Sequence, residues 1–280
     1  MDHPRTDAYL RRIGADRPSA PTADALRALH LAHLLAVPFE NLSVHLGEEI
    51  VLDADALVAK LVDRGRGGFC YELNGAFSAL LVALGFEVTP LQARVVGKDG
   101  RLGIPYDHMA LRVRTAEGTT WLADVGFGTH THFPLAFDER GEQADPGGVF
   151  RIEDANTDGD GDGDADATSV EGAAEGDLLV LLDGEPQYLL EQRPRTLRDF
   201  EAGAWYHRTS PASHFTQSLV CSRLTEDGRI TLSGHTLTTT VGDDRTVTEL
   251  PTDTSVLEAY DQHFGIVLDH VPPEPNPTEG

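Results

Sequence analysis

Residues 66–74 read Arg-Gly-Gly-Phe-Cys-Tyr-Glu-Leu-Asn, a turn that leads into a helix. The glycine pair favours the turn, and from Cys70 onward apolar residues recur at helical spacing. These apolar positions are Leu73, Phe77, Leu80, Leu81 and Leu84. Gly85 follows them, where a left-handed residue commonly ends a helix. The pattern predicts a helix over about 70–84, with Cys70 at its N-terminal end.

Helices are predicted before this segment and strands after it. The expected helices lie at about 7–13, 23–37 and 54–62. Thr22 and Asp53 are suitable N-caps for the second and third of them. The expected later elements are strands at 87–91, 93–96, 109–114, 120–125, 177–182 and 187–191, short strands within 218–250, and a helix at about 254–264. Asp183-Gly184 predicts a tight hairpin.

The charge balance is strongly acidic, with 22 lysines and arginines against 46 aspartates and glutamates and a formal net charge of −24. Such a surface repels nucleic acid and anionic membranes, so we expect neither as a partner. Residues 138–177 carry half of the net charge, and the other half is scattered through the chain. This distribution fits a halophilic protein, because in molar salt the Debye length falls to about 3 Å. A mesophilic acidic protein is the alternative.

Residues 138–177 also contain an Asp-Gly repeat that invites comparison with a calcium-binding loop. An EF-hand loop needs glycine at its sixth position and glutamate at its twelfth, and no register of the repeat provides both. We therefore expect a disordered acidic insertion at about 138–177. The proline-rich residues 271–280 predict a disordered tail.

The chain lacks the run of about 18 apolar residues that a membrane helix needs, and its first residues lack the apolar run of a signal peptide. We therefore expect a soluble cytoplasmic protein. In that reducing compartment Cys70 and Cys221 are expected to be free thiols. Cys221 follows two apolar residues in a predicted strand, and we interpret it as part of the core.

Cys70 is a candidate nucleophile because a helix N-terminus stabilises a thiolate. The Arg-Gly-Gly turn before it could bring backbone N–H groups close to a bound acyl oxygen. Thiol catalysis also needs a base and a group that orients the base. His108 precedes one predicted strand and Asp124 ends the next, so the three side chains can meet if these strands are neighbours. Position alone leaves a buried core cysteine as an equal alternative.

The other histidines carry weaker signals. His130 and His132 resemble a pair of metal ligands, but no third ligand is evident, and we interpret them as part of an exposed loop. His207, His214 and His235 are interpreted as surface or structural residues. No metal site is therefore expected.

Four motifs extend the argument beyond single residues. They are Arg66–Asn74, Val37-Pro-Phe-Glu-Asn41, Asp124-Val-Gly-Phe-Gly128 and Ser213-His-Phe-Thr-Gln-Ser-Leu-Val220. In this order they resemble the arylamine N-acetyltransferases over roughly 5–137 and 178–268. The resemblance implies an α+β fold with a cysteine-protease or transglutaminase-like catalytic core. Its expected parts are a helical bundle at 1–86, a β-barrel at 87–195 that contains the insertion, an α/β lid at 196–270 and the tail at 271–280.

The resemblance also implies a ping-pong reaction in which acetyl-CoA is a co-substrate and no cofactor stays bound. Acetyl-CoA would acetylate Cys70, and an aromatic amine or hydrazine would then take the acetyl group. By motif position His108 would be the base and Asp124 the residue that orients it. Further residues in matching motifs are expected to bind substrate or coenzyme A: Arg66, Gly67, Gly68, Phe39, Gly126, Phe127 and Gly128.

Two other functions use the same sequence features differently. The same three side chains could serve hydrolysis or amide exchange, as in a peptidase or transglutaminase, and the absence of any acyl adduct from acyl-CoA would favour that function. A non-enzymatic binding protein on a degenerate fold would be favoured if Cys70→Ala left activity unchanged. The strong negative charge also predicts that local basic residues or high salt must assist binding of the coenzyme A phosphates.

Overall fold

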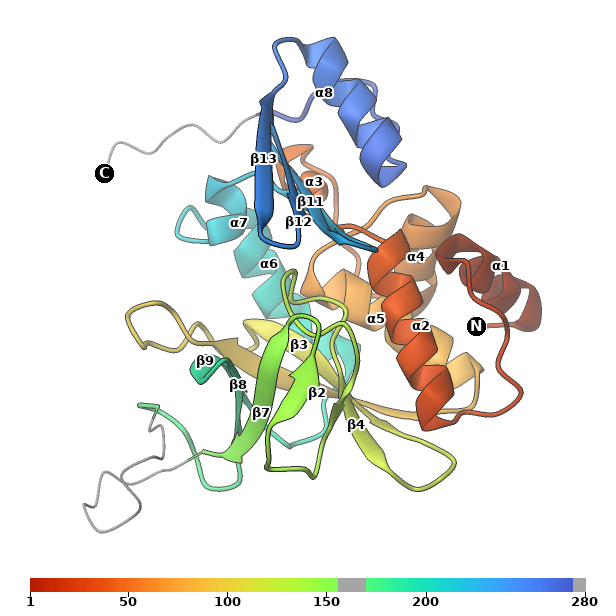
Figure 1. The fold of residues 1–280 in the computed structure, drawn as a ribbon, viewed down its shortest axis with the longest axis vertical. Coiled ribbons are helices and arrows are strands. Elements are labelled where there is room, and N and C mark those ends of the chain that lie inside the picture. Colours follow the sequence, from red (N-terminus) through yellow and green to blue (C-terminus); the bar gives the residue numbers. More distant parts are fainter. Residues whose placement is uncertain (156–169, 274–280) are drawn as a thin grey trace.

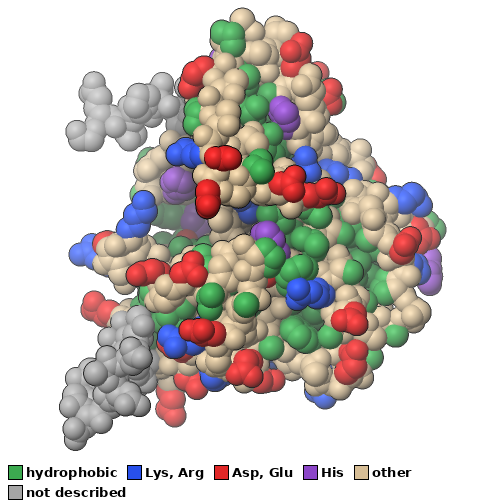
Figure 2. Space-filling model, viewed as in Figure 1, with side chains coloured by type: hydrophobic (Ala, Val, Ile, Leu, Met, Phe, Trp, Pro, Cys, Tyr) green, Lys and Arg blue, Asp and Glu red, His purple; other side chains and the backbone are tan. Residues whose placement is uncertain are grey.

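The computed structural model describes residues 1–155 and 170–273, and it contains two antiparallel sheets and a group of N-terminal helices (Figure 1). The view places the eight-stranded sheet below, the five-stranded sheet above and the N-terminal helices at the right. Acidic side chains are spread over this face of the molecule and do not gather in one patch (Figure 2). No helix among the described residues is long and apolar enough to cross a membrane. The Asp-Gly repeat and residues 274–280 lie outside the described ranges.

The N-terminal helices follow the predicted pattern. They are α1 (His3–Ile13), α2 (Ala23–Ala36), α4 (Ala54–Val58), which continues into the π-helical turn η1 (Ala59–Asp63), and α5 (Cys70–Ala83). Thr22 caps α2 by accepting a hydrogen bond from the Ala25 amide at 3.2 Å, and Asp53 caps α4 in the same way, so both predicted caps are confirmed. The apolar face of α5 is fully buried and forms the centre of the first hydrophobic core.

The larger sheet has the strand order β5-β4-β3-β2-β9-β8-β7-β6. Its strands are β2 (Glu87–Val95), β3 (His108–Arg114), β4 (Thr120–Ala123), β5 (Leu135–Ala136), β6 (Gln143–Asp145), β7 (Gly148–Asp154), β8 (Leu178–Leu182) and β9 (Glu185–Leu190). The two edge strands β5 and β6 are joined by one side chain. The side-chain oxygen of Gln143 accepts a hydrogen bond from the backbone N–H of Ala136 at 2.7 Å. The side-chain nitrogen of Gln143 donates one to the backbone carbonyl of Ala136 at 3.1 Å. These two bonds nearly close the sheet into a barrel.

The prediction of a disordered insertion was wrong for its first part, because strands β6 and β7 lie within it. In β7 the side chains of Phe150 and Ile152 are fully buried, whereas Arg151 and Glu153 between them remain partly exposed. This is the alternation of a half-buried strand. The charged residues occupy the outer face of the barrel, so the acidic composition of the segment concealed its apolar alternation.

The hairpin between β8 and β9 has the turn that its sequence predicts. Asp183 and Gly184 both have positive φ, 52° and 84°. Two successive residues in this region define the turn type that matches the twist of the flanking strands, and Asp-Gly is a preferred pair for it. The prediction from these two residues is confirmed.

The smaller sheet combines the two ends of the chain, in the order β1-β10-β11-β12-β13. Its strands are β1 (Phe39–Glu40), β10 (Cys221–Thr225), β11 (Gly228–Ser233), β12 (Thr236–Val241) and β13 (Asp244–Glu249). In β1, Phe39 pairs with Ser222 and Glu40 with Cys221. The short helices α3 (Leu42–His45), η2 (Leu197–Phe200), α6 (Glu201–Thr209), α7 (His214–Gln217), α8 (Asp253–Ala259) and η3 (Tyr260–Phe264) complete the fold. Strand β1 thus holds the smaller sheet beside the start of α5, because Phe39 also forms an isolated bridge with Gly68.

Candidate active site

Cys70 is the first residue of α5, and its side chain is buried. Phe69 before it has an extended conformation, and its amide donates a hydrogen bond to the Glu72 carboxylate at 3.2 Å. This bond fixes the point at which the chain turns into the helix. Cys70 therefore lies where predicted, at a helix N-terminus, and both thiols of the chain are free and buried.

His108 and Asp124 meet at adjacent ends of paired strands. His108 begins β3, Asp124 follows β4, and the two strands are antiparallel neighbours. The His108 Nε2 atom lies 2.7 Å from Asp124 Oδ2, and both side chains are almost fully buried. The other oxygen of Asp124 accepts hydrogen bonds from the Asn74 side chain at 2.9 Å and the Gly126 amide at 3.0 Å. These bonds fix the carboxylate, which in turn fixes the imidazole.

The charges of this pair shift its pKa values in opposite directions. Burial lowers the pKa of His108, but the charge and hydrogen bond of Asp124 and the neighbouring Cys70 outweigh burial and raise that pKa to about 10. Burial raises the pKa of Asp124, but the charge and hydrogen bond of His108 more than offset it and hold the pKa of Asp124 below its usual value. Burial raises the pKa of the Cys70 thiol, while the hydrogen bond and charge of His108 lower it part of the way back. At neutral pH the buried pair is an imidazolium and a carboxylate.

A pH dependence of stability follows from these shifts. The folded state holds the His108 proton to about pH 10, whereas the unfolded state releases it near 6.5. The stabilisation is therefore complete below about 6.5 and is lost as the pH rises through 10. We expect the melting temperature of the wild type to fall over this range more steeply than that of His108→Gln. Parallel pH profiles for the two proteins would contradict the shift.

Cys70 and His108 line a cavity of about 530 Å³ between the barrel and the smaller sheet. Of the residues predicted from the motifs, Phe39, Gly126, Phe127 and Gly128 lie in its wall. The cavity is also lined by Val95, Asp107, Thr129, His207, His214, Phe215, Val220, Ser222 and Thr231. Aromatic rings are prominent in the wall: the Phe127 ring is 5.1 Å from that of His108, and the Phe39 ring is 6.1 Å from that of Phe215. The cavity is thus suited to a planar apolar molecule close to a thiol.

Gly126 allows the chain after β4 to approach Cys70 closely. A Cβ atom at this position would lie 2.8 Å from Cys70 Cα and 2.7 Å from Asn74 Nδ2. One of these atoms belongs to the helix backbone, so the neighbours cannot move away freely. We expect Gly126→Ala to destabilise the protein by about 1–3 kcal/mol and to lower activity, because it displaces Cys70 relative to His108. Chemical unfolding and the rate of Cys70 acetylation measure the two effects, and wild-type values for both would contradict the close approach.

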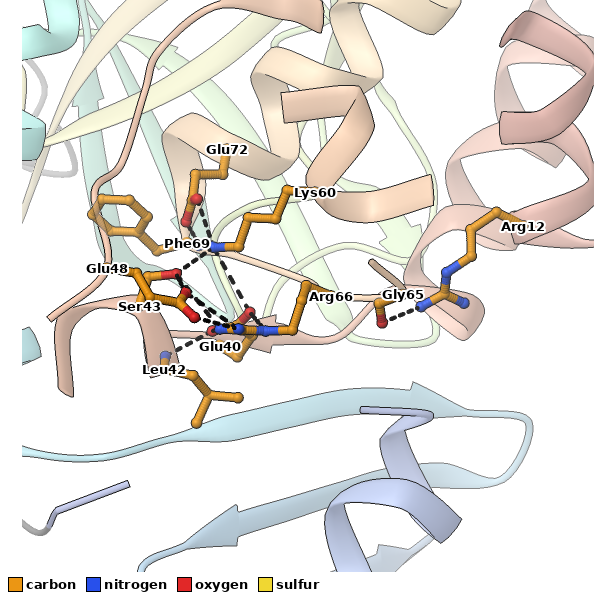
Figure 3. A network of polar contacts seen from close by, with 10 residues as sticks. All are labelled: Arg12, Glu40, Leu42, Ser43, Glu48, Lys60, Gly65, Arg66, Phe69 and Glu72. Atoms are coloured by element: carbon orange, nitrogen blue, oxygen red, sulfur yellow. Dashed lines mark hydrogen bonds and ion pairs between the residues drawn. The ribbon is translucent and has the colours of Figure 1, made fainter. Parts of the chain in front are cut away.

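Arg66, Gly67 and Gly68 do not line the cavity, although they belong to the same motif. Arg66 is buried in a polar network, where its guanidinium donates to Glu40 at 3.1 Å and to Glu48 at 3.2 Å (Figure 3). At Gly67 a Cβ atom would lie 1.9 Å from the Pro38 carbonyl oxygen, and at Gly68 it would lie 2.6 Å from the Glu72 side chain. This turn therefore packs against the residues around the start of α5 and does not face the cavity.

Two histidines lie elsewhere than the sequence suggested. His130 is buried, not part of an exposed loop, and its ring stacks on Tyr188 at 5.5 Å. Burial lowers its pKa to about 4, although the charge of Asp124 acts in the opposite direction. Among the described residues no group of three or more His, Cys, Asp or Glu side chains could hold a metal ion. His207, interpreted as surface or structural, is a buried residue of the cavity wall.

Sequence reasoning assigned no role to Asn74, Asp107 or Tyr188. Asn74 stands in the quoted motif one helical turn after Cys70, and that spacing could have placed it beside the nucleophile. Its side chain binds Asp124 and the Met109 carbonyl, at 2.9 and 2.6 Å. Asp107 adjoins His108 in sequence, but its orientation depends on the turn. Tyr188 comes from β9, about eighty residues along the chain, and no local signal connects it to the site.

Comparisons with known proteins agree with the motifs. A family model described as N-acetyltransferase matches residues 22–271. The arylamine N-acetyltransferase of Mycolicibacterium smegmatis is 37% identical over 266 residues, which cover 93% of this chain and 91% of that protein. A Salmonella typhimurium protein described as arylamine N-acetyltransferase / N-hydroxyarylamine O-acetyltransferase is 33% identical over 94% of this chain and 89% of its own length.

Solved structures show the same fold. The arylamine N-acetyltransferase of Salmonella typhimurium superposes with a TM-score of 0.81 at 32% identity and covers 95% of this chain and 92% of that one. The enzyme of Mycobacterium marinum, solved in complex with CoA, has a TM-score of 0.78 at 31% identity and covers 93% of this chain and 92% of that one. The predicted α+β class is confirmed, with N-terminal helices, a near-closed barrel and a further sheet. The chain belongs to the arylamine N-acetyltransferase family.

Proposed function

We propose that this chain transfers the acetyl group of acetyl-CoA to an aromatic amine or hydrazine in two steps, with acetyl-Cys70 between them. The observation that carries the proposal is the buried His108–Asp124 pair, 2.7 Å apart, beside a thiol in the wall of a 530 Å³ cavity. An imidazolium next to a thiol is the arrangement that makes a cysteine nucleophilic at neutral pH. The relatives that cover more than nine-tenths of the chain support acetyl transfer over hydrolysis.

Each of the three side chains has one task in the first step. Cys70 attacks the acetyl carbonyl as the thiolate paired with the His108 imidazolium, the bond from that carbon to the sulfur of coenzyme A breaks, and His108 gives its proton to the departing thiolate. Asp124 keeps the imidazole facing Cys70 and stabilises its positive charge. In the second step the amine nitrogen forms a bond to the acetyl carbon and gives up a proton to His108, which the first step left neutral, and the electron pair of the breaking C–S bond returns to Cys70.

The walls of the cavity favour an aromatic acceptor. Phe127, Phe39 and Phe215 present rings close to Cys70, and offset or edge-on packing of an aromatic ring against such walls is favourable. A planar acceptor would thus be held with its amine toward the thioester.

Initial-rate kinetics test the two-step course. Rates measured at several acetyl-CoA concentrations, with an aromatic amine or hydrazide varied, should give parallel double-reciprocal lines, because coenzyme A leaves before the acceptor reacts. Lines that intersect would show that both substrates are bound together and would contradict an acetyl-Cys70 intermediate. A panel of anilines, hydrazines and hydrazides in the same assay identifies the preferred acceptor.

We further propose that salt helps this acidic protein to bind the phosphate groups of acetyl-CoA. A net charge of −24 repels an anionic ligand, and ions screen that repulsion. The KM for acetyl-CoA should therefore stay constant or fall as sodium chloride is raised toward molar concentration. The KM of an uncharged acceptor provides the control for general salt effects. A steep rise in the acetyl-CoA KM alone would contradict the screening.

A further inference from the structure

Arg229 is a partly buried cation with no protein counter-charge in contact. It lies on β11, and its guanidinium donates one hydrogen bond, to the Ser222 hydroxyl at 3.2 Å. Among the described residues no carboxylate lies in ion-pair range of it, although the whole chain has 46 acidic residues against 22 basic ones. Removing a charged group from water without a partner is costly. An arginine in this setting is suited to bind an anion.

Arg229 adjoins the catalytic cavity. Its partner Ser222 lines the cavity together with Thr231, and the two hydroxyl oxygens are 2.8 Å apart. Arg229 also borders a small hollow whose wall includes Phe127 and Gly128, and both of these residues belong to the cavity wall as well. The arginine therefore lies at the edge of the space that contains the nucleophile.

A second arginine shares this face of the smaller sheet. Arg229 is paired with Thr240 on β12, and Thr240 is paired with Arg245 on β13. Directly opposite residues of antiparallel strands point to the same face, and so does Thr231, two residues after Arg229. Arg245 is exposed, and the turn between Thr240 and Arg245 points toward the eight-stranded sheet (Figure 1). The arginine row (Arg229, Thr240 and Arg245) thus combines two guanidinium groups with a hydroxyl on the face that lines the cavity.

The strand order places the arginine row at a suitable distance from the nucleophile. Phe39 on the first strand of this sheet forms a bridge with Gly68, two residues before Cys70. Strands lie about 4.8 Å apart, so β11 is three spacings or about 14 Å from Gly68, and β13 is five spacings or about 24 Å from it. The pantetheine arm of acetyl-CoA has three units, each about as long as an extended residue or slightly longer, and spans roughly 10–15 Å. A thioester at Cys70 therefore leaves the phosphates near the row.

We propose that Arg229 and Arg245 bind the phosphate groups of acetyl-CoA. The pantetheine arm then runs along the cavity wall from the arginine row to Cys70. Guanidinium groups bind phosphate oxygens through charge-assisted and often bidentate hydrogen bonds. Two such cations at the site act at short range against the repulsion that a net charge of −24 exerts on an anionic donor. This inference rests on the proposed function, because it concerns the acetyl donor of the first step.

An acetyl donor without phosphates separates this role from a structural one. S-acetylpantetheine has the thioester and the arm of acetyl-CoA but no phosphate group. The second-order rate constant for Cys70 acetylation is measured with each donor by rapid quench and intact mass, and the ratio of acetyl-CoA to S-acetylpantetheine is compared between proteins. Arg229→Met should lower this ratio about ten- to a hundredfold and leave the rate with S-acetylpantetheine unchanged. Arg245→Met should lower it about two- to fivefold, because Arg245 is exposed.

Arg151→Met is the matched control. It removes one positive charge from the outer face of the barrel, where Arg151 pairs with Glu153 at 2.6 Å, and it should keep the wild-type ratio. Arg245→Met tests the row even if Arg229→Met does not fold.

Three results would overturn phosphate binding by the arginine row and leave the two-step function intact. They are equal slowing with both donors in Arg229→Met, a wild-type ratio in Arg245→Met, and a ratio lowered as far in Arg151→Met as in Arg245→Met. A wild-type protein that forms no acetyl adduct with either donor would instead overturn the proposed function.

Discussion

Replacing Asp124 by asparagine should lower the rate of Cys70 acetylation by about ten-thousandfold while leaving the fold intact. The neutral amide cannot balance the charge of the imidazolium, so the pKa of His108 would fall from about 10 toward its ordinary value. An amide N–H that donates to Nε2 would also place the single proton of the neutral ring on Nδ1, so that Nδ1 could no longer accept a proton. Rapid-quench acetylation followed by intact mass measures the effect.

The control for this variant is a carboxylate of similar size outside the site. Asp99 is exposed in the loop between β2 and β3, and Asp99→Asn should acetylate at the wild-type rate. The melting temperature of Asp124→Asn should stay close enough to that of the wild type for both to be folded at the assay temperature. A folded Asp124→Asn protein that acetylates at more than about a tenth of the wild-type rate would show that Asp124 does not hold the base.

Replacing Lys60 by methionine should lower the free energy of unfolding by about 3–5 kcal/mol. Lys60 and Arg66 are the two cations of the buried network, and the Lys60 ammonium lies 2.6 Å from the Glu72 carboxylate (Figure 3). Glu40 and Glu72 are almost fully buried, and the charges of Lys60 and Arg66 are what hold the pKa of Glu40 below its usual value despite burial. Without Lys60, the Glu72 carboxylate would remain buried with no counter-charge in contact. Chemical denaturation of the purified variant measures the loss.

Two further proteins isolate the cause of that loss. Lys60→Met combined with Glu72→Gln removes the unpaired charge and keeps an oxygen to accept from the Phe69 amide, so it should recover part of the stability. Arg151→Met removes a cation from the outer face of the barrel, where its partner Glu153 is 2.6 Å away but can be solvated, and it should have little effect. A Lys60→Met protein no less stable than Arg151→Met would contradict the interpretation of the network.

The sequence predicts best those parts of the fold in which local chemistry and packing agree. Thr22 and Asp53 cap helices, Asp183-Gly184 forms the hairpin turn, and the stripe after Cys70 becomes the buried helix α5. Each of these features depends on residues close together in the chain. The meeting of His108 with Asp124 could be predicted as well, because they terminate consecutive strands of an antiparallel pair.

The remaining features depend on contacts between distant parts of the chain. The acidic residues around Phe150 conceal a barrel strand, because its outward side chains dominate the composition. The pairing of β1 with β10 joins residues about 180 positions apart, and no turn signal connects them. His207 reaches the cavity only because α6 packs against the turn that carries Asp107. Such contacts follow from the tertiary packing of several elements and cannot be seen in a local pattern.

The central claim is that Cys70 carries the acetyl group. Wild-type protein and Cys70→Ala are incubated with acetyl-CoA without an acceptor, and each is examined by intact mass and peptide mapping. The wild type should gain the mass of one acetyl group, located on Cys70, and should lose it when an aromatic amine is added. Cys70→Ala should gain none, although the buried Cys221 remains present. An acetyl group on Cys221 or another residue, or an unmodified wild type that still acetylates amines, would contradict the account.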